Sequence, residues 1–474
     1  MPQDILLHDT MTRSVKNVRA ADGETVRFYC CGPTVYGPAH IGNFRTFVAQ
    51  DVLRRTLELA GWKTKHVRNI TDVDDKTIRQ SQAQGQTLGE FTGHWLGLFR
   101  ADCAALNLLP PHVEPGAVAH IPQQIKLVEA LLMKQHAYRT EDGSVYFRIE
   151  SFPRYGRLSR VKERELSTGG TGSGKNLSDE YERESLADFA LWKARKPEDG
   201  ANVWCAPWGE GRPGWHLECS CMSMRYLGES FDLHGGGVDL IFPHHENEIA
   251  QSEAATGKEF AAHWFHTAHL LVENRKMSKS EGNLFTLEDL NNKGCTPMET
   301  RYVLLAGKYS QPLNFTLESL SAARAALKKL AKAAASLSAG AGEISYEQLV
   351  SQAASLSVDN PFHAAWEALK NDLNVSEALG QTFVALKDAG NFADKTAAWL
   401  GFQRIINALG LVLPAADDDA IVSVPAGVQE LAAKRWAAKQ TKNWQLADEY
   451  RARLTALGWA MQDAKDDYKL APLK

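Results

Sequence analysis

The feature that most constrains the fold is a β-α-β unit near the N-terminus. VRFYCC (26–31) is short, β-branched and aromatic, which predicts a strand, and KHVRNI (65–70) predicts a second one. Between them, apolar residues recur at helical spacing from about His40 until Gly61, where a helix can end. Strands joined by such a crossover helix are parallel, and the helix begins at their carboxyl ends, where its unpaired N–H groups favour phosphate. The sequence therefore predicts an α/β fold with a phosphate site near His40.

Composition excludes several other classes of protein. The 474 residues, 44% hydrophobic and 23% charged, are enough for about three globular domains. No stretch approaches the roughly 18 apolar residues of a membrane span, and MPQDILLHDT carries no signal sequence, so we expect a cytoplasmic protein with no membrane partner. Seven scattered cysteines favour reduced thiols over a disulfide framework. A net charge of −4 permits a nucleic-acid partner held by local basic patches.

Two short motifs are candidates for binding an anion. HIGN (40–43) stands at the predicted helix start, although alone it is equally typical of a capped helix with a surface histidine. RKMSKSEGN (275–283) places Lys276 and Lys279 three residues apart on a polar loop, where both can converge on one anion.

Four residues of metal-ligand type form a second candidate site: Cys31, Cys219, His244 and Glu248. Pro243 suits the first turn of a helix, and a spacing of four then places His244 and Glu248 on one helix face. Two thiolates, an imidazole and a carboxylate favour zinc over magnesium or calcium. Spacing alone leaves open that the cysteines are ordinary buried thiols, because they form no C-x-x-C pair.

HIGN together with KMSKS resembles the two signature motifs of class I aminoacyl-tRNA synthetases, which activate an amino acid with ATP. KMSKS matches at all five positions, whereas HIGN departs from the commoner HIGH at Asn43, whose amide can still donate a hydrogen bond to ribose or phosphate. The resemblance implies that His40, Asn43, Lys276 and Lys279 are catalytic and bind ATP. There they would stabilise the charge that builds on the phosphoryl oxygens and on the leaving pyrophosphate.

Longer segments resemble the cysteinyl-tRNA synthetase family: CCGPTVYGPAHIGN, VRNITDVDD, GRPGWHLECS and FDLHGGGVDLIFPHHENEIAQS. The resemblance implies one zinc ion on Cys31, Cys219, His244 and Glu248 that coordinates the sulfur of the substrate. Zinc lowers the pKa of a thiol and prefers thiolate to the harder hydroxyl of serine, so no editing domain is needed. With four protein ligands already present, substrate binding must add a fifth ligand or loosen one, and Glu248, the hard oxygen donor, is the one we expect to yield.

Five further residues match positions of that family. Thr71 and Trp215 would bind the substrate, Trp215 as an apolar wall, although core packing explains Trp215 equally well. His234, Gly236 and Asp239 in HGGGVD would lie near ATP, where glycine permits close backbone approach and Asp239 could hold ribose hydroxyls. As a bare motif HGGG also fits an oxyanion loop of a hydrolase, but no G-x-S-x-G accompanies it.

The expected architecture is a Rossmann-like parallel-sheet catalytic domain with an inserted connective domain, then an all-α helical bundle and a small C-terminal anticodon-binding domain. The expected bounds are 1–118 and 202–258 for the two halves of the catalytic domain, 119–201 for the insertion, 259–315 for the KMSKS loop and stem-contact region, 316–413 for the bundle and 414–474 for the last domain.

The C-terminal domain is predicted from two helical segments, VQELAAKRWAAKQ and WQLADEYRARLTALG, that carry basic residues and two tryptophans. This combination suits phosphates and stacked bases, and a solvated helical face is the simpler alternative. A separate motif, STGGTGSGKNL (167–177), has the spacing of a P-loop, but we do not interpret it as one. Its flanks are too charged for a buried strand and Asn176 lacks the hydroxyl that binds magnesium, so we expect a flexible loop tip.

The function implied is that of a monomeric, cytoplasmic enzyme that forms cysteinyl-adenylate from L-cysteine and ATP, with Mg²⁺ on the ATP, and transfers the cysteinyl group to the 3′ end of tRNA(Cys). One alternative is the cysteine ligase of mycothiol biosynthesis, which uses related chemistry on an amino sugar but lacks an anticodon module. Another is a P-loop NTPase or a nucleic-acid-binding protein without catalysis.

Overall fold

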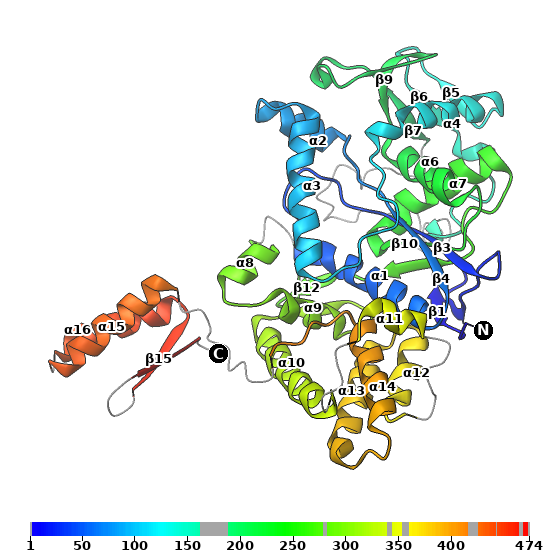
Figure 1. Ribbon diagram of the computed structural model, residues 1–474. Helices are drawn as coiled ribbons and strands as arrows, with labels where there is room; N and C mark the ends of the chain where they lie inside the picture. Colours follow the sequence, from blue (N-terminus) through cyan, green and yellow to red (C-terminus); the bar gives the residue numbers. More distant parts are fainter. Residues whose placement is uncertain are drawn as a thin grey trace.

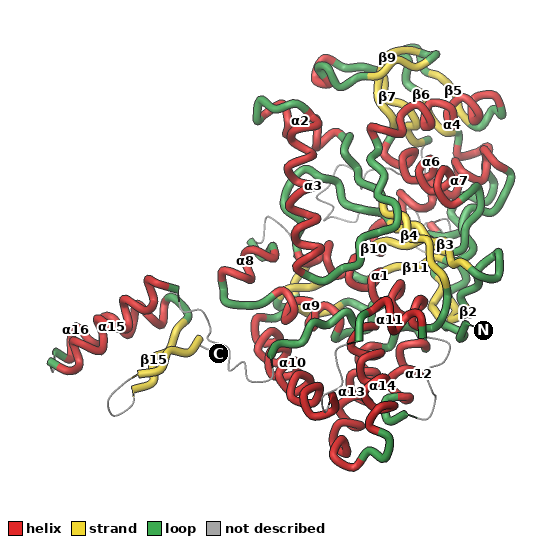
Figure 2. Tube along the Cα trace, viewed as in Figure 1, coloured by secondary structure: helices red, strands yellow, loops and turns green. Residues whose placement is uncertain are grey.

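The computed structural model describes residues 2–161, 188–277, 282–338, 344–352, 360–415, 425–441, 443–463 and 468–472; Figures 1 and 2 show their arrangement. The P-loop-like segment 167–177 and Lys279 lie outside the described residues. Within the described ranges, no helix combines the length and the apolar character that crossing a membrane requires.

A four-stranded parallel sheet, in the order β11-β10-β3-β4, forms the centre of the molecule. Its strands are β3 (Thr25–Cys30), β4 (Lys63–Arg68), β10 (Leu233–Gly237) and β11 (Trp264–Thr267). Helix α1 (Ile41–Leu59) crosses from β3 to β4, so the β-α-β unit predicted from the sequence is confirmed. Because all four strands are parallel, their carboxyl ends lie at one edge of the sheet, next to the N-terminus of α1.

Helix α1 begins and ends where the sequence predicts. His40 is its N-cap, in an extended conformation, and Gly61 follows the helix with a φ of 92°, a value that favours glycine. Phe44, Val48 and Leu53 are among the buried residues of the helix and belong to the main hydrophobic core. Burying each such side chain stabilises the fold by about 1.5–3 kcal/mol.

Four more helices belong to this part of the molecule: α2 (Asp75–Ala83), which packs on α3 (Leu88–Ala105), and α6 (Trp215–Leu227), which packs on α7 (Glu246–Thr256). Helix α6 contacts β3, β4 and α7, and its buried residues join a second core that also contains Tyr29 and Val67 of the sheet. Helices α6 and α7 therefore pack together beside the carboxyl end of β3.

The insertion between the two halves of the sheet is a helix and a five-stranded antiparallel sheet in the order β5-β6-β7-β9-β8 (Figure 1, top). Its elements are α4 (Ile121–Met133), β5 (Ala137–Arg139), β6 (Val145–Phe147), β7 (Phe189–Ala194), β8 (Trp204–Ala206) and β9 (Gly209–Pro213). Strands β8 and β9 lie beyond residue 201, where the sequence analysis ended the insertion. They are short, and GEGRP has no alternating apolar pattern to mark it as a strand.

The chain then forms a small three-stranded sheet and a helical bundle. The sheet is β13 (Arg275–Lys276), β12 (Leu270–Val272) and β14 (Leu313–Phe315), with α8 (Leu287–Asn292) and α9 (Pro297–Leu305) before β14. The bundle contains α10 (Leu317–Ser338), α11 (Tyr346–Ser351), α12 (His363–Lys370), α13 (Val375–Ala385) and α14 (Lys395–Ala408). An all-α bundle over 316–413 was expected from its Ala- and Leu-rich composition, and the described elements of that range are helical. At the N-terminus, β1 (Leu6–Asp9) and β2 (Ser14–Asn17) form a hairpin.

The C-terminal unit is a helical hairpin with a β-hairpin packed on it (Figure 1, orange and red). Helices α15 (Ala426–Gln440) and α16 (Trp444–Ala456) are the two expected from the sequence, and Gly458 ends the second with a φ of 78°. Strands β15 (Trp459–Asp463) and β16 (Tyr468–Pro472) were not expected. Val428, Leu454 and Trp459 join helices and hairpin in one small core.

Candidate functional site

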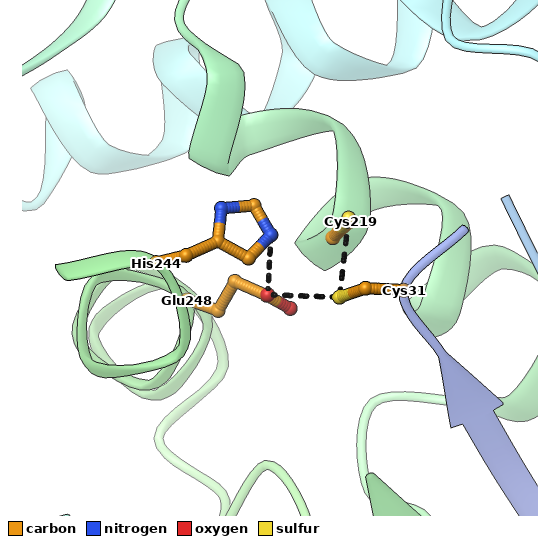
Figure 3. Close-up of side chains that lie close together, drawn as sticks. All are labelled: Cys31, Cys219, His244 and Glu248. Carbon is orange, nitrogen blue, oxygen red and sulfur yellow. Dashed lines mark hydrogen bonds and ion pairs between the residues drawn. The ribbon is translucent and has the colours of Figure 1, made fainter. Parts of the chain in front are cut away.

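The four predicted metal ligands converge in the structure (Figure 3). Cys31 follows β3 and Cys219 lies on α6. His244 lies in the short helical turn Ile241–His245 that leads into α7, and Glu248 lies in the first turn of α7. His244 Nε2 is 3.0 Å from Glu248 Oε1, Cys31 Sγ is 3.9 Å from the same oxygen, and the two sulfurs are 3.9 Å apart. All four donor atoms lie within 4.8 Å of one another, close enough to hold one metal ion.

Local backbone features bring these side chains together. Gly214 packs so closely on β7 that a Cβ there would lie 2.0 Å from Ala190 O, and α6 starts at the next residue. Phe242 is extended (φ −141°, ψ 133°), so the helical turn begins after it, at Pro243, as the sequence suggested. Because α6 packs on both β3 and α7, the ligands near the starts of the two helices and at the end of β3 reach the same point.

The cluster is buried, and its ionisable groups shift one another's pKa values. Burial alone would raise the pKa of the Glu248 carboxyl, but His234 and His244 lower it to about 2. Burial would lower the pKa of His244, but Glu248 and Cys219 raise it to about 10. Burial would raise the pKa of the Cys219 thiol, yet its hydrogen bond with Cys31 and the neighbouring His244 lower it to about 6. At neutral pH the cluster thus holds an imidazolium beside two anions, and a divalent cation can replace that proton.

Two further histidines form hydrogen bonds with ligand atoms that face away from the cluster. His234 Nε2 is 2.9 Å from Glu248 Oε2, which leaves Oε1 to face the cluster. His216 Nδ1 is 2.9 Å from His244 Nδ1, which leaves His244 Nε2 to face it. Such partners fix the orientation of metal ligands.

A chain of hydrogen bonds reaches Cys31 from the other side. His245 Nε2 lies 3.3 Å from Cys31 Sγ, His245 Nδ1 lies 2.8 Å from His266 Nε2, and His266 Nδ1 lies 2.8 Å from Thr10 Oγ1. Burial lowers the pKa of both histidines, that of His266 to about 3, so both rings are neutral. The tautomers of the two rings set the direction in which this chain donates, and in either direction one proton is shared between His245 Nε2 and Cys31 Sγ.

The sequence analysis missed His216, His245 and His266, and it placed His234 with ATP. In the structure His234 is completely buried and stacks on Trp264 with ring centroids 4.8 Å apart, behind Glu248. A sequence signal existed for two of the three, because His216 and His245 directly adjoin predicted site residues in GWHLECS and FPHHENE. His266 lies on β11, outside the motifs that carry the predicted site residues, and only the fold brings it to the site.

The two predicted substrate contacts lie beside the cluster. Trp215 stacks on His244, with ring centroids 4.1 Å apart and planes 30° apart. Thr71 Oγ1 donates a hydrogen bond to Glu218 Oε1 and accepts one from Asn69 Nδ2 at 3.2 Å. Burial, and then the neighbouring Cys219, raise the pKa of the Glu218 carboxyl well above its usual range.

At the start of α1, His40 and Asn43 form a reciprocal cap. His40 Nδ1 accepts a hydrogen bond from Asn43 N at 3.2 Å, and Asn43 Oδ1 accepts one from His40 N at 3.1 Å. Since Nδ1 is an acceptor, the proton of the neutral His40 ring is on Nε2. Asparagine therefore has a structural role at the last position of HIGN, where HIGH has histidine. Asn43 Oδ1 completes the cap, while the NH₂ group of the same side chain remains a donor.

The HIGN and KMSKS motifs meet in the structure. Ile41 N donates to Phe285 O at 2.9 Å, and a Cβ on Gly42 would lie 3.6 Å from Met277 Sδ. Lys276 is exposed at the end of β13, opposite Leu271 of β12. Lys279 lies outside the described residues, so its contact with ATP stays a prediction.

Gly236 lies near the end of β10, and Asp239 lies in the short helical turn Val238–Leu240 that follows this strand. A Cβ on Gly236 would lie 2.8 Å from Leu240 Cδ1 and 3.0 Å from His245 Cε1, so glycine here makes room for the histidine chain. Asp239 is exposed. The predicted contacts of both residues with ATP remain predictions.

The basic C-terminal hairpin presents only part of its predicted surface to solvent. Trp444 is 59% exposed, whereas Arg435 is buried and Trp436 packs on Tyr468 with ring centroids 5.6 Å apart. Trp444 is thus the most exposed of the described aromatic residues of this unit and the best placed to stack on a base.

Comparison with known proteins agrees with this geometry. Residues 17–325 match the family model "tRNA synthetases class I (C) catalytic domain". The chain is 52% identical over 472 residues to the cysteine–tRNA ligase of Opitutus terrae, with 99% of each chain covered. It is 43% identical over 480 residues to the cysteine–tRNA ligase of Chlamydia felis, with 99% of this chain and 98% of the relative covered.

Among solved structures, the fold is similar to that of methionyl-tRNA synthetase from Mycobacterium tuberculosis in complex with methionyl-adenylate. The TM-score is 0.55 at 14% identity, covering 81% of this chain and 89% of the other. At that identity the likeness concerns the fold alone, and it confirms the expected Rossmann-like catalytic domain followed by helices.

Proposed function

This chain belongs to the cysteine–tRNA ligases, the class I aminoacyl-tRNA synthetases that form cysteinyl-tRNA, and from this premise we propose that Cys31, Cys219, His244 and Glu248 hold one zinc ion that selects cysteine. The single observation that carries the proposal is the convergence of these four donors in one buried cluster. Relatives that match almost the whole chain, C-terminal unit included, favour this function over a cysteine–amino sugar ligase.

The donor set supports zinc over magnesium and calcium. Magnesium and calcium are hard cations that prefer oxygen ligands, whereas thiolates are soft ligands. The described donors also form a compact buried set rather than an oxygen-lined loop. The outer hydrogen bonds from His216 and His234 leave one nitrogen and one oxygen facing the cluster, as ligation requires. When bound, zinc supplies a Lewis acid that lowers the pKa of the substrate thiol and prefers thiolate to the hydroxyl of serine.

The protein residues around the cluster bind the rest of cysteine. Trp215, stacked on His244, forms an apolar wall, and Thr71 offers a hydroxyl whose direction is fixed by Glu218 and Asn69. Trp215 contacts His244 directly, and Thr71 is linked to Cys219 through Glu218, so both can hold the amino acid while its sulfur is recognised.

ATP binds at the start of α1 in this proposal. The helix N-terminus and His40 Nε2–H donate to the phosphates, Asn43 and Asp239 bind ribose or phosphate, and Gly236 allows close approach. Lys276 and Lys279 stabilise the charge on the α-phosphate and on pyrophosphate as the cysteine carboxylate attacks, with Mg²⁺ accompanying ATP. The tRNA terminal hydroxyl then takes the cysteinyl group, and the C-terminal unit binds the anticodon end. A monomer located in the cytoplasm stays our expectation.

The experiment that tests the zinc assignment is exchange of labelled pyrophosphate into ATP, which reports adenylate formation without tRNA. We expect exchange with cysteine but not with serine or alanine, loss of exchange when zinc is removed by a chelator, and recovery when zinc is restored. Each metal-free preparation is compared with an untreated one by circular dichroism, so that unfolding is not mistaken for loss of the metal. Undiminished exchange from a folded protein without zinc would contradict the proposal.

A further inference from the structure

Arg45 is a buried cation one turn along α1 from His40, and it is 2% exposed. Its guanidinium donates to four main-chain oxygens: Ala268 O at 3.0 Å, Leu304 O at 3.4 Å, Lys308 O at 3.1 Å and Gln311 O at 2.7 Å. Burial lowers the pKa of Arg45 to about 10, so it is charged at neutral pH. In the described part of the chain these bonds end on carbonyls rather than on carboxylates, so the charge is stabilised by backbone dipoles from separate segments.

Those segments form the base of the sheet that carries Lys276. Ala268 connects β11 to β12, and β12 pairs with β13, which ends at Lys276. Leu304 lies at the end of α9, while Lys308 and Gln311 lie in the loop that leads into β14, the other neighbour of β12. The same loop bonds to Ala268 directly, through Ala268 N to Tyr309 O at 2.8 Å. One side chain on α1 therefore holds together the segments that lead into β12 and into β14, the two strands that support the β12–β13 hairpin with Lys276.

The far end of the KMSKS segment is also fixed to α1. Ile41 N donates to Phe285 O at 2.9 Å, and His40 forms an isolated bridge with Thr286. The helix that carries His40 thus contacts the chain before Lys276, through Arg45, and after the motif, through its first turn.

We propose that Arg45 is a positioning residue for ATP: it sets the distance between the helix N-terminus with His40 and the hairpin with Lys276, so that both reach the same phosphates. The inference rests on the proposed assignment of those two residues to ATP. Arginine suits the task because its planar fork can bind several carbonyls at once, whereas the lysine ammonium is a point charge with a different geometry. A shift of about 1 Å in a positioned group can cost about a hundredfold in rate.

The test compares Arg45→Lys and Arg45→Met with the wild type in pyrophosphate exchange, with ATP and cysteine varied separately. We expect Arg45→Lys to raise KM for ATP about tenfold or to lower kcat by a similar factor, with KM for cysteine and zinc content unchanged. Arg45→Met should show a larger effect in the same direction. If Arg45→Met does not fold, Arg45→Lys, which keeps the charge, carries the test alone.

Arg404→Met is the matched control. Arg404 is also a buried arginine that donates to a carbonyl, Leu59 O at 2.6 Å, and lies 3.6 Å from the ring centre of Trp366, but it does not touch the hairpin. It should lower the melting temperature and leave KM for ATP unchanged. Equal KM and kcat for Arg45→Lys and wild type, or equal rises in KM for ATP and for cysteine, would overturn the inference.

The variant Lys276→Ala distinguishes this inference from the proposed function. If Lys276→Ala slows exchange and Arg45→Lys does not, the positioning role alone fails. If neither variant affects exchange, the assignment of ATP to this site fails as well.

Discussion

Replacement of Cys219 by serine is expected to lower cysteine-dependent pyrophosphate exchange about a thousandfold, or about 4 kcal/mol in the activation barrier. Serine nearly preserves the volume of the side chain, which is 1% exposed, so the packing of α6 changes little. The hydroxyl is, however, a hard and weakly acidic ligand, and the cluster loses one of its two soft donors. Zinc content, measured by elemental analysis of the purified variant, should fall from one per chain toward zero at the same time.

Cys221→Ser provides the matched control on the same helix. Cys221 is also a free, buried thiol on α6, but it is not among the clustered donors. This variant should retain zinc and exchange activity even where it loses some stability. If Cys219→Ser keeps both its zinc and its activity, or if Cys221→Ser loses both as completely, the ligand assignment is wrong.

Replacement of Lys279 by alanine should lower kcat for adenylate formation by about 10²–10³-fold, the usual cost of removing a group that stabilises transition-state charge. KM for cysteine should change little, because the proposed amino-acid site lies at the candidate metal cluster. The measurement is pyrophosphate exchange at saturating ATP and cysteine, with the zinc content of the variant determined alongside. Zinc content should equal that of the wild type, which separates this defect from loss of the metal.

Lys258→Ala controls for the removal of a positive charge. Lys258 is an exposed lysine paired with Glu229 at 2.6 Å, away from both motifs, and its loss should leave exchange unchanged. A Lys279→Ala enzyme as active as the Lys258→Ala enzyme would show that the KMSKS lysine does not stabilise the transition state.

The catalytic fold was predictable where local pattern and chain connectivity agree. The apolar spacing of α1, its cap at His40 and its end at Gly61 are all written in consecutive residues, so the β-α-β unit and its parallel sheet follow from the sequence. Strands β8 and β9 and the C-terminal β-hairpin were not predicted, because short strands gain their stability from cross-strand pairing that no local pattern reveals. The domain boundaries as a whole remain predictions.

The four candidate metal ligands were predictable from the sequence, but the residues that hydrogen-bond to them were not. Cys31, Cys219, His244 and Glu248 are of metal-ligand type and stand in motifs that resemble those of the family, and the structure brings them together. The partners that orient them come from elsewhere: His266 lies on β11 and Thr10 follows β1, and only the assembled sheet brings them to His245. The role of Arg45 is hidden for the same reason, since all four of its acceptors are main-chain oxygens that no residue type identifies.

The most direct test of the central claim, that the clustered ligands hold a metal that selects cysteine by its thiolate, is the absorption spectrum of the enzyme with cobalt in place of zinc. Cobalt bound to thiolates absorbs both in its ligand-field bands and in sulfur-to-metal charge transfer, and the bands report the number and type of ligands. We predict that cysteine adds charge-transfer intensity and changes the ligand-field bands, as a new sulfur enters and Glu248 yields or a fifth ligand is added, while serine leaves the spectrum unchanged. A spectrum that cysteine does not alter, under conditions where cysteine supports pyrophosphate exchange, would contradict the claim.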